Sequence, residues 1–124
     1  MPATYSGIWP VAPTPFHDDG SVDLEGMKRV LDCLIDQGAD GVCVLANFSE
    51  QFLISDAERE TLTRLSLEHI AGRVPVIVTI SHYATQIAVE RARFAKDLGA
   101  DIVMMMPPYH GALLKGDAQQ TFEQ

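Results

Sequence analysis

The sequence predicts an α/β protein built from four consecutive βα units around a parallel sheet. Four short, almost continuously apolar runs have the character of buried parallel strands, and they span residues 7–12, 41–46, 75–80 and 101–106. Between these runs lie segments with apolar residues at helical spacing. A Gly-Ala-Asp triplet precedes both the second and the fourth run. Strands that alternate with helices favour right-handed crossovers and a parallel sheet.

Each helical segment has a recognisable start or a glycine at its end. The expected helices cover residues 24–35, 55–70 and 85–98, and a further helix begins near Asp117. The start signals are a capping aspartate and a Ser-x-x-Glu capping box, at Asp23 and at Ser55 with Glu58. The glycines that suit the helix ends are Gly38, Gly72 and Gly99.

Two architectures fit this pattern: a (βα)8 TIM barrel and a doubly wound open sheet. Residues 13–16, which follow the first expected strand, read Pro-Thr-Pro-Phe and contain no G-x-G, so a nucleotide-binding open sheet is disfavoured. A complete barrel takes about 250 residues. The 124 residues therefore predict the N-terminal half of a barrel, a single truncated domain 1–124 with strands 1 to 4 and the start of helix 4. We expect a missing half or a second copy to cover its edges.

Composition excludes several classes of protein. The net charge of −8 provides no basic stripe for nucleic acid. No apolar run reaches the length of a membrane span, and no basic and then apolar leader precedes the first strand, so we expect a cytoplasmic protein. Cys33 and Cys43 fall in elements expected to be buried, which favours reduced core thiols; a disulfide or a metal pair is the alternative.

Polar or aromatic side chains follow all four expected strands. In a barrel, the chemistry lies at the carboxyl ends of the strands. The candidates there are Thr14, Asn47, Phe48, Ser49, Glu50, Ser81, His82, Tyr83, Tyr109 and His110. Loops are usually polar because they are exposed to solvent, and that would explain any single one of these residues. Their occurrence after four strands out of four predicts a functional rim.

Four stretches of the chain resemble the dihydrodipicolinate synthase and N-acetylneuraminate lyase superfamily. They are GIWPVAPTPF at 7–16, residues 40–60, residues 76–85, and DIVMMMPPYH at 101–110. Members of this superfamily are barrels that form a Schiff base with a 2-keto acid. The resemblance covers nearly the whole chain and implies the same fold, no cofactor and no metal. It also implies a homo-oligomer, a dimer or tetramer, in the complete enzyme.

One departure from the superfamily pattern concerns the loop after the second strand. The synthases have Gly-Thr-Thr-Gly-Glu there, whereas residues 46–50 read Ala-Asn-Phe-Ser-Glu. Asn47 can donate to a substrate carboxylate and Ser49 supplies a hydroxyl, but Phe48 cannot replace a threonine in a proton relay. The strings at 45–52, 81–83 and 107–112 are most similar to the L-2-keto-3-deoxyarabonate dehydratase branch, which eliminates water from a 2-keto-3-deoxy sugar acid.

The resemblance implies roles for individual residues. Tyr109 would lie near the proton-transfer machinery and reach a neighbouring subunit's site; an aromatic plug at a dimer contact is the alternative. Glu50 would brace its loop. His82 and His110 would tune proton transfer or contact substrate hydroxyls, although ordinary loop histidines fit as well. Thr14 and Tyr83 complete the expected set of contacts to a 2-keto sugar acid.

The nucleophile is not evident in the chain. The three lysines are Lys28, Lys96 and Lys115, on two helices and in a loop, where none is expected to be desolvated enough to be neutral. The superfamily's Schiff-base lysine belongs to the sixth strand, which this chain does not reach. The isolated chain is therefore predicted to be inactive.

Three alternatives to a dehydratase remain open. The first is 4-hydroxy-tetrahydrodipicolinate synthase or another aldolase of the same superfamily. The second is half of a metal-dependent aldolase, with ligands at Glu50, His82 and His110. The third is a non-catalytic half barrel that binds another half or its own twin.

Overall fold

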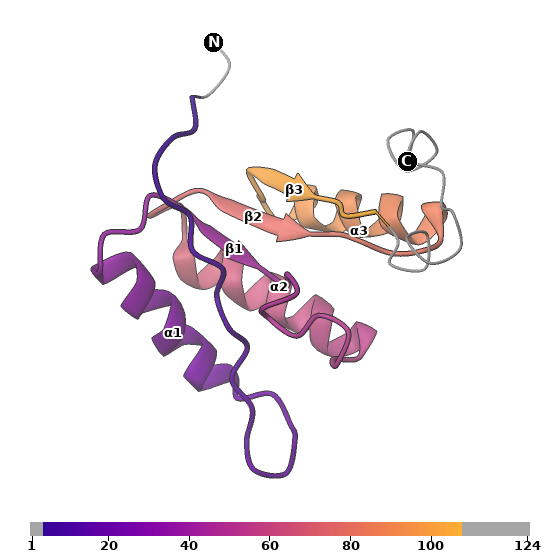
Figure 1. The fold of residues 1–124 in the computed structure, drawn as a ribbon, viewed down its shortest axis with the longest axis horizontal. Coiled ribbons are helices and arrows are strands. Elements are labelled where there is room, and N and C mark those ends of the chain that lie inside the picture. The colour runs from indigo at the N-terminus through magenta and orange to yellow at the C-terminus, as the bar shows by residue number, and fades with distance from the viewer. Residues whose placement is uncertain (1–3, 108–124) are drawn as a thin grey trace.

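A computed structural model of the chain describes residues 4–107 (Figure 1). Helices and strands alternate along it in the order α1 (Leu24–Asp36), β1 (Val42–Val44), α2 (Asp56–Ile70), β2 (Val76–Thr79), α3 (Thr85–Asp97) and β3 (Ile102–Met104). The three strands are parallel, and β2 lies between β1 and β3. The predicted α/β class with a parallel sheet is therefore confirmed.

The segment expected to form the first strand, residues 7–12, is not a regular strand. It runs parallel to β1 and joins it through a single bridge between Val11 and Cys43. The Ala12 N–H donates to the Cys43 carbonyl oxygen at 2.8 Å, and the Cys43 N–H donates to the Pro10 carbonyl oxygen at 2.9 Å. Prolines at 10 and 13 have no N–H to donate, so a continuous ladder cannot form there.

The helices pack on one face of the sheet. Register pairs Val42 with Val76 and Val44 with Val78 on the same face. These four valines belong to one buried cluster with side chains from all three helices, namely Met27, Leu31, Leu62, Ile70 and Ala95. The opposite face carries Cys43, Ile77 and Ile102, which are register partners. A sheet covered by helices on one face alone is the arrangement of a barrel wall.

The order of strands favours a barrel over a doubly wound sheet. Residues 7–12, β1, β2 and β3 lie next to one another in chain order. A doubly wound sheet reverses its strand order at a switch point, and none occurs among these four segments. The barrel with four complete units stays a prediction, because the helix expected near Asp117 lies outside the described residues.

Local chemistry explains where the helices begin. The Asp23 carboxylate accepts the Gly26 N–H at 2.8 Å at the start of α1. At the start of α2, the Ser55 hydroxyl accepts the Glu58 N–H at 3.1 Å, and the Glu58 carboxylate accepts the Ser55 N–H at 2.9 Å. Both predicted caps are confirmed. The N-cap of α3, Ala84, makes no side-chain cap.

The Gly-Ala-Asp triplets have the same structure in both places. Each follows a helix of 13 residues, and its glycine has a positive φ, 93° at Gly38 and 95° at Gly99. Each aspartate then accepts a backbone N–H from the start of the preceding strand-like segment. Asp40 accepts that of Ile8 at 2.8 Å, and Asp101 accepts that of Val76 at 2.9 Å. The triplet therefore ends a helix and ties neighbouring strands at their amino ends.

The expectation that both cysteines are buried is wrong for one of them. Cys43 is buried in β1, whereas Cys33 is exposed on α1. The buried positions of α1 are Gly26, Met27 and Leu31, so Cys33 falls on the other side of the helix. Both thiols are free. Between residues 4 and 107, no helix is long and apolar enough to cross a membrane.

Candidate functional site

Several polar side chains are buried where the strands end. At this carboxyl edge, the loops after residues 7–12, after β1 and after β2 come together, as parallel strands require. The buried polar residues of these segments are Thr14, Ser49, Gln51, Thr79 and Ser81. Burial of a polar group without a hydrogen bond is costly, so each of these side chains needs a partner or a ligand.

The loop after β1 is compact and strained. The N–H groups of Ser49 and Gln51 both donate to the Ala46 carbonyl oxygen, at 3.0 and 3.4 Å. Two residues of the loop have left-handed backbone conformations without being glycine: Leu45 and Glu50, each with φ of 61°. Such conformations persist only where surrounding contacts enforce them, and they concentrate at functional sites.

The structure places the Ser49 hydroxyl inside this loop. Ser49 is fully buried, and its Oγ donates to the Ala12 carbonyl oxygen at 2.5 Å. This bond links the loop to the end of residues 7–12. A substrate contact by Ser49 stays a prediction, since its hydroxyl already serves a structural bond.

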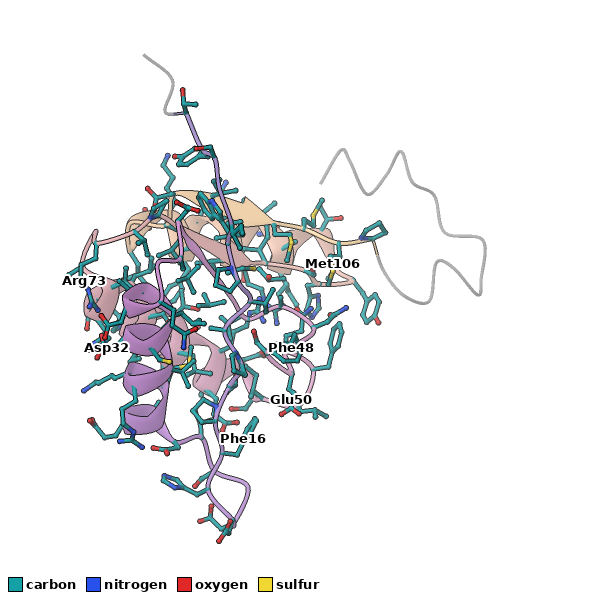
Figure 2. All side chains as sticks on the ribbon, turned by 60° about the vertical axis from the view of Figure 1, so that its left-hand side comes forward. Phe16, Asp32, Phe48, Glu50, Arg73 and Met106 are labelled. Atoms are coloured by element: carbon teal, nitrogen blue, oxygen red, sulfur yellow. The ribbon has the colours of Figure 1, made fainter. Side chains whose placement is uncertain are left out.

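The other three predicted residues of the loop, Asn47, Phe48 and Glu50, are exposed. Figure 2 labels Phe48 and Glu50 in this loop, and 69% of the surface of Phe48 is accessible. The amide oxygen of Asn47 accepts a hydrogen bond from Nε2 of Gln51 at 2.7 Å. Sequence reasoning missed Gln51; a polar residue inside the family-like string at 45–52 was the available signal.

Thr14 lies at the same edge, two residues beyond Ala12. Its side chain is buried, with 7% of the residue exposed. Among the described residues its hydroxyl has no hydrogen-bond partner. A buried hydroxyl without a partner has the capacity to bind a ligand oxygen.

The loop after β2 forms the other side of the edge. The Ser81 hydroxyl accepts the Met106 N–H at 2.8 Å, which ties this loop to the end of β3. Nδ1 of His82 accepts the Ala84 N–H at 2.9 Å, so the neutral imidazole carries its proton on Nε2. The rings of His82 and Tyr83 lie 6.4 Å apart at 59°.

A hollow of about 200 Å³ brings the two loops together. Gln51, Phe52 and Ile54 line it from the loop after β1, and Ser81, His82 and Tyr83 line it from the loop after β2. Arg91, Met106 and Pro107 complete its wall. His82 and Tyr83 therefore share a concave surface, whereas Tyr109 and His110 lie outside the described residues.

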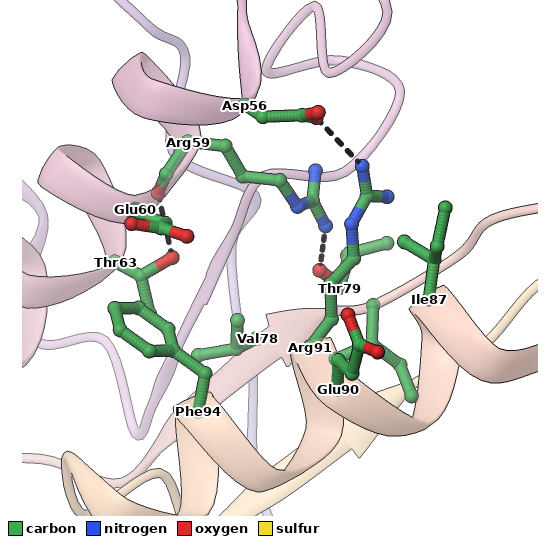
Figure 3. A pocket seen from close by; sticks show the side chains of 11 residues that line it. Asp56, Arg59, Glu60, Thr63, Val78, Thr79, Ile87, Glu90, Arg91 and Phe94 are labelled. Atoms are coloured by element: carbon green, nitrogen blue, oxygen red, sulfur yellow. Dashed lines mark hydrogen bonds and ion pairs between the residues drawn. The ribbon is translucent and has the colours of Figure 1, made fainter.

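Two arginines hold the end of β2 from the helix layer (Figure 3). Arg59, only 6% exposed, donates to the Thr79 carbonyl oxygen. Arg91 donates to the Ser81 carbonyl oxygen at 2.5 Å and pairs with Asp56 at 3.3 Å. Burial is the main cause that lowers the pKa of Arg59 to about 10, and the neighbouring Arg91 adds to it. A hollow of about 370 Å³ between α2, β2 and α3 surrounds this pair.

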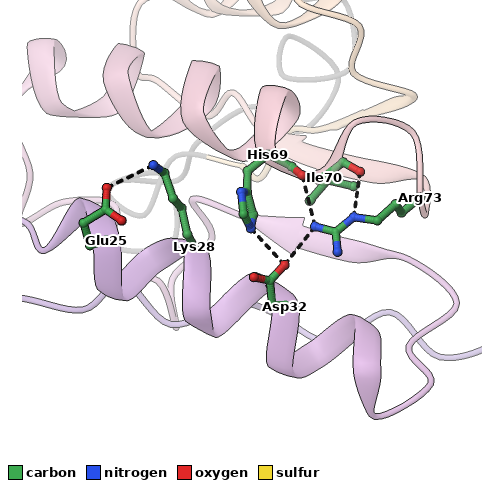
Figure 4. A network of polar contacts seen from close by, with 6 residues as sticks. All are labelled: Glu25, Lys28, Asp32, His69, Ile70 and Arg73. Carbon is green, nitrogen blue, oxygen red and sulfur yellow. Dashed lines mark hydrogen bonds and ion pairs between the residues drawn. The ribbon is translucent and has the colours of Figure 1, made fainter.

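A separate network joins α1 to α2 away from the strand ends (Figure 4). The Asp32 carboxylate contacts Nε2 of His69 at 2.8 Å and the Arg73 guanidinium at 2.9 Å. Hydrogen bonds from Arg73, and then from His69, hold the pKa of the Asp32 carboxyl below its usual range. In the part of the chain that the structure describes, no three His, Cys, Asp or Glu side chains are placed to hold a metal.

Comparison with known proteins identifies relatives along nearly the whole chain. Residues 4–124 match the Dihydrodipicolinate synthetase family. An L-2-keto-3-deoxyarabonate dehydratase from Azospirillum brasilense is 58% identical over 119 residues, 96% of this chain and 38% of that protein. A 4-hydroxy-tetrahydrodipicolinate synthase from Polynucleobacter asymbioticus is 37% identical over 107 residues, 86% of this chain and 35% of that protein. The chain thus spans little more than a third of the length of these relatives.

The fold of the chain also resembles that of solved structures. A prophage protein of the dihydrodipicolinic acid synthase family from E. coli K12, solved in complex with pyruvate, superposes with a TM-score of 0.88 and 30% identity. This match covers 98% of the chain and 41% of that protein. N-acetylneuraminate lyase from Mycoplasma synoviae gives a TM-score of 0.81 with 31% identity, over 85% of this chain and 37% of that one.

Proposed function

The chain belongs to the dihydrodipicolinate synthetase family, and from this premise we propose that it forms one side of the substrate site of a 2-keto acid lyase. The proposed reaction is that of an L-2-keto-3-deoxyarabonate dehydratase, with four βα units of a barrel supplied by this chain. The observation that carries the proposal is the identity of 58% with such a dehydratase, against 37% with a synthase.

The loop after β1 supports a dehydratase over a synthase. Phe48 stands where the synthase pattern has a threonine hydroxyl, and its ring is exposed instead of being hydrogen-bonded. A phenyl ring can neither donate nor accept a proton. The proton relay of the synthases is therefore absent from this position, whereas Asn47 keeps the capacity to donate to a carboxylate.

The proposed chemistry proceeds through an iminium. A lysine amine condenses with the C2 ketone and releases water, and the iminium acidifies the C3 hydrogens. Loss of a C3 proton leaves an enamine, which expels the C4 hydroxyl as water once that hydroxyl is protonated. Hydrolysis then consumes one water and frees the lysine. The net change is loss of one water from the 2-keto-3-deoxy acid.

Each candidate residue has a proposed place in this scheme. Asn47 and the Thr14 hydroxyl bind the carboxylate and keto end of the substrate. His82 and Tyr83, which line the hollow between the loops, contact its hydroxyl end. Ser49 and Glu50 shape the loop, and Tyr109 and His110, outside the described residues, are assigned to proton transfer.

We propose that none of the three lysines of this chain, Lys28, Lys96 and Lys115, is the nucleophile, and that the lysine belongs to the sixth strand of the complete barrel. Lys28 is on α1, 3.0 Å from the Glu25 carboxylate, and Lys96 is exposed in the last turn of α3. Neither side chain is buried, whereas a Schiff-base lysine lies in a desolvated, apolar site. Borohydride reduction of the isolated 124-residue chain with pyruvate should therefore leave no covalent adduct. A single stoichiometric adduct would contradict this part of the proposal.

The test of the function uses the complete protein encoded by the gene that contains this sequence. It is incubated with a 2-keto-3-deoxypentonic acid, and the products are identified by mass spectrometry. A dehydratase releases a keto acid lighter by one water. An aldolase releases pyruvate and a shorter aldehyde instead. No turnover together with a concentration-dependent molecular mass would favour the non-catalytic interaction module, and would also account for the exposure of Phe48, Phe52 and Leu53.

A further inference from the structure

Arg91, on α3, joins two segments that follow different strands. Its Nη1 donates to the Ser81 carbonyl oxygen at 2.5 Å, in the loop after β2. Its Nη2 lies 3.3 Å from the Asp56 carboxylate, at the start of α2 and directly after the loop that follows β1 (Figure 3). Only 20% of the Arg91 side chain is exposed, so water competes little for these bonds. One guanidinium therefore links the two loops that face each other across the hollow of about 200 Å³.

The bond to Ser81 holds a part of the chain that the sheet no longer supports. The backbone bond from the Ile80 N–H to the Met104 carbonyl oxygen, at 2.9 Å, marks the end of the ladder between β2 and β3. Beyond it, the Ser81 hydroxyl accepts the Met106 N–H, a contact along the same edge of the sheet. Arg91 ties the loop in another direction, to the helix layer. Its bond is charge-assisted and therefore stronger than one between neutral groups.

The carbonyl group that Arg91 holds determines where His82 points. The Ser81 carbonyl and the His82 nitrogen belong to the same planar peptide unit, so a fixed carbonyl fixes the start of His82. At its other end, Nδ1 of His82 accepts the Ala84 N–H at 2.9 Å. The neutral ring therefore carries its proton on Nε2 and can only donate there. Since His82 lines the hollow, this N–H is the donor that it offers to a ligand.

Arg59 makes the same type of bond without reaching this hollow. It donates to the Thr79 carbonyl oxygen, and Thr79 is still in register with Met104 of β3. Arg59 lines the hollow of about 370 Å³ between α2, β2 and α3, whereas Arg91 lines both hollows. The two arginines thus support β2 in a similar way, and Arg91 is the one of this pair that also holds the loop with His82.

We propose that Arg91 is a positioning residue that directs the Nε2–H of His82 toward a hydroxyl oxygen of a bound 2-keto-3-deoxy sugar acid. This inference rests on the proposed function. Pyruvate has the carboxylate and the ketone of such an acid but none of its hydroxyl groups. Loss of Arg91 should therefore weaken the binding of the sugar acid and leave the binding of pyruvate unchanged.

The test uses the complete protein and measures kcat and KM for a 2-keto-3-deoxypentonic acid, and the inhibition constant of pyruvate. Arg91→Met removes both polar contacts and keeps an unbranched side chain. We expect its KM to rise about fivefold or more, with the inhibition constant of pyruvate changed less than about twofold. Arg91→Lys keeps the charge and a donor, so its KM should lie between those of the wild type and Arg91→Met. Arg59→Lys is the matched control and should leave both constants unchanged.

A double-mutant cycle with His82→Ala separates positioning from a purely structural role. If Arg91 acts through His82, the double variant of Arg91→Met and His82→Ala should have the same KM as His82→Ala alone. Multiplied effects in the double variant, or a wild-type KM in Arg91→Met or His82→Ala, would overturn the inference. Equal rises of KM and of the pyruvate inhibition constant would do the same, because they indicate a general distortion of the site. If Arg91→Met does not fold, Arg91→Lys serves in the same comparisons.

Failure of this inference differs from failure of the proposed function. A wild-type protein that dehydrates the sugar acid, with variants that miss the expected pattern, would overturn the role of Arg91 alone. A wild-type protein that neither binds nor turns over any 2-keto acid would overturn the proposed function, and this inference with it.

Discussion

Ser49 and Ala12, 37 residues apart in sequence, are joined by a buried hydrogen bond of 2.5 Å from hydroxyl to carbonyl oxygen. The bond connects the loop after β1 to the end of residues 7–12, which otherwise meet β1 through a single bridge. Since that segment contains Pro10, is followed by Pro13 and cannot form a full ladder, a side chain takes over part of the role of the missing backbone bonds.

Ser49→Ala should lower the free energy of unfolding by about 1 to 2 kcal/mol, because it leaves the Ala12 carbonyl oxygen buried and unpaired. Urea denaturation checks this value. Thr61→Ala is the matched control, since it also removes a hydroxyl bonded to a carbonyl oxygen, but at an exposed site on α2. Equal effects of the two substitutions would contradict the importance of burial.

Glu50→Gly should not destabilise the protein, in contrast to the same change in a helix. Glu50 has a φ of 61°, a conformation that costs an L-residue about 1 to 2 kcal/mol and glycine nothing. The relief of this strain offsets the greater freedom of glycine in the unfolded chain. Glu60→Gly, at an exposed position of α2, should cost about 1 kcal/mol. The Tm of each variant, measured by thermal unfolding, tests this expectation. A larger loss of stability in Glu50→Gly than in Glu60→Gly would show that the glutamate side chain braces the loop.

Asp101→Ala should lower the free energy of unfolding by about 1 kcal/mol, because the Val76 N–H at the amino end of β2 loses its carboxylate acceptor. Asp101→Asn keeps an oxygen at the same place and should recover part of the loss. Asp97→Ala, at the last residue of α3, is the control and should change stability little. Hydrogen exchange at the Val76 amide reports directly on the bond, and unchanged protection in Asp101→Ala would contradict it.

The stabilising contribution of the Asp32 carboxylate should be lost in acid. Its pKa in the folded protein is held below the ordinary aspartate value of 3.8, first by Arg73 and then by His69. The unfolded chain therefore binds a proton more readily. The stabilisation is complete above that ordinary value and is lost as the pH falls through the lower folded pKa. Asp32→Asn should flatten the dependence of Tm on pH below about pH 4. Asp36→Asn on the same helix should leave the dependence of Tm on pH unchanged. The same decrease of Tm in acid for the wild type and both variants would argue against the network.

The two cysteines should react at very different rates. Cys33 is exposed, whereas Cys43 is buried and burial raises the pKa of its thiol, so little thiolate forms there. Iodoacetamide should modify Cys33 in the native protein, and Cys43 only after denaturation. Mass spectrometry of digested peptides locates the label. The Cys33→Ser variant should stay unlabelled in its native state, and rapid labelling of that variant would show that β1 opens.

The elements with strong local signals were predictable. Asp23 and the Ser55–Glu58 pair start helices where expected, and Gly38 and Gly99 follow their ends. Such signals act between residues a few positions apart, so they survive without knowledge of the rest of the fold. The expected regular strand at 7–12 did not form for a local reason as well, because Pro10 and the following Pro13 cannot donate the backbone hydrogen bonds of a ladder.

For the loop residues, the sequence predicted the position along the chain but not the hydrogen-bond partners. The sequence by itself determined that polar and aromatic groups follow each strand, that the strands are parallel, and therefore that these groups share one edge. Only the tertiary structure decided that Ser49 turns inward to Ala12, that Gln51 holds Asn47, and that Arg59 is buried against Thr79. Neither burial nor the partner of a polar side chain follows from its neighbours in sequence, because both depend on segments that the fold brings together from far along the chain.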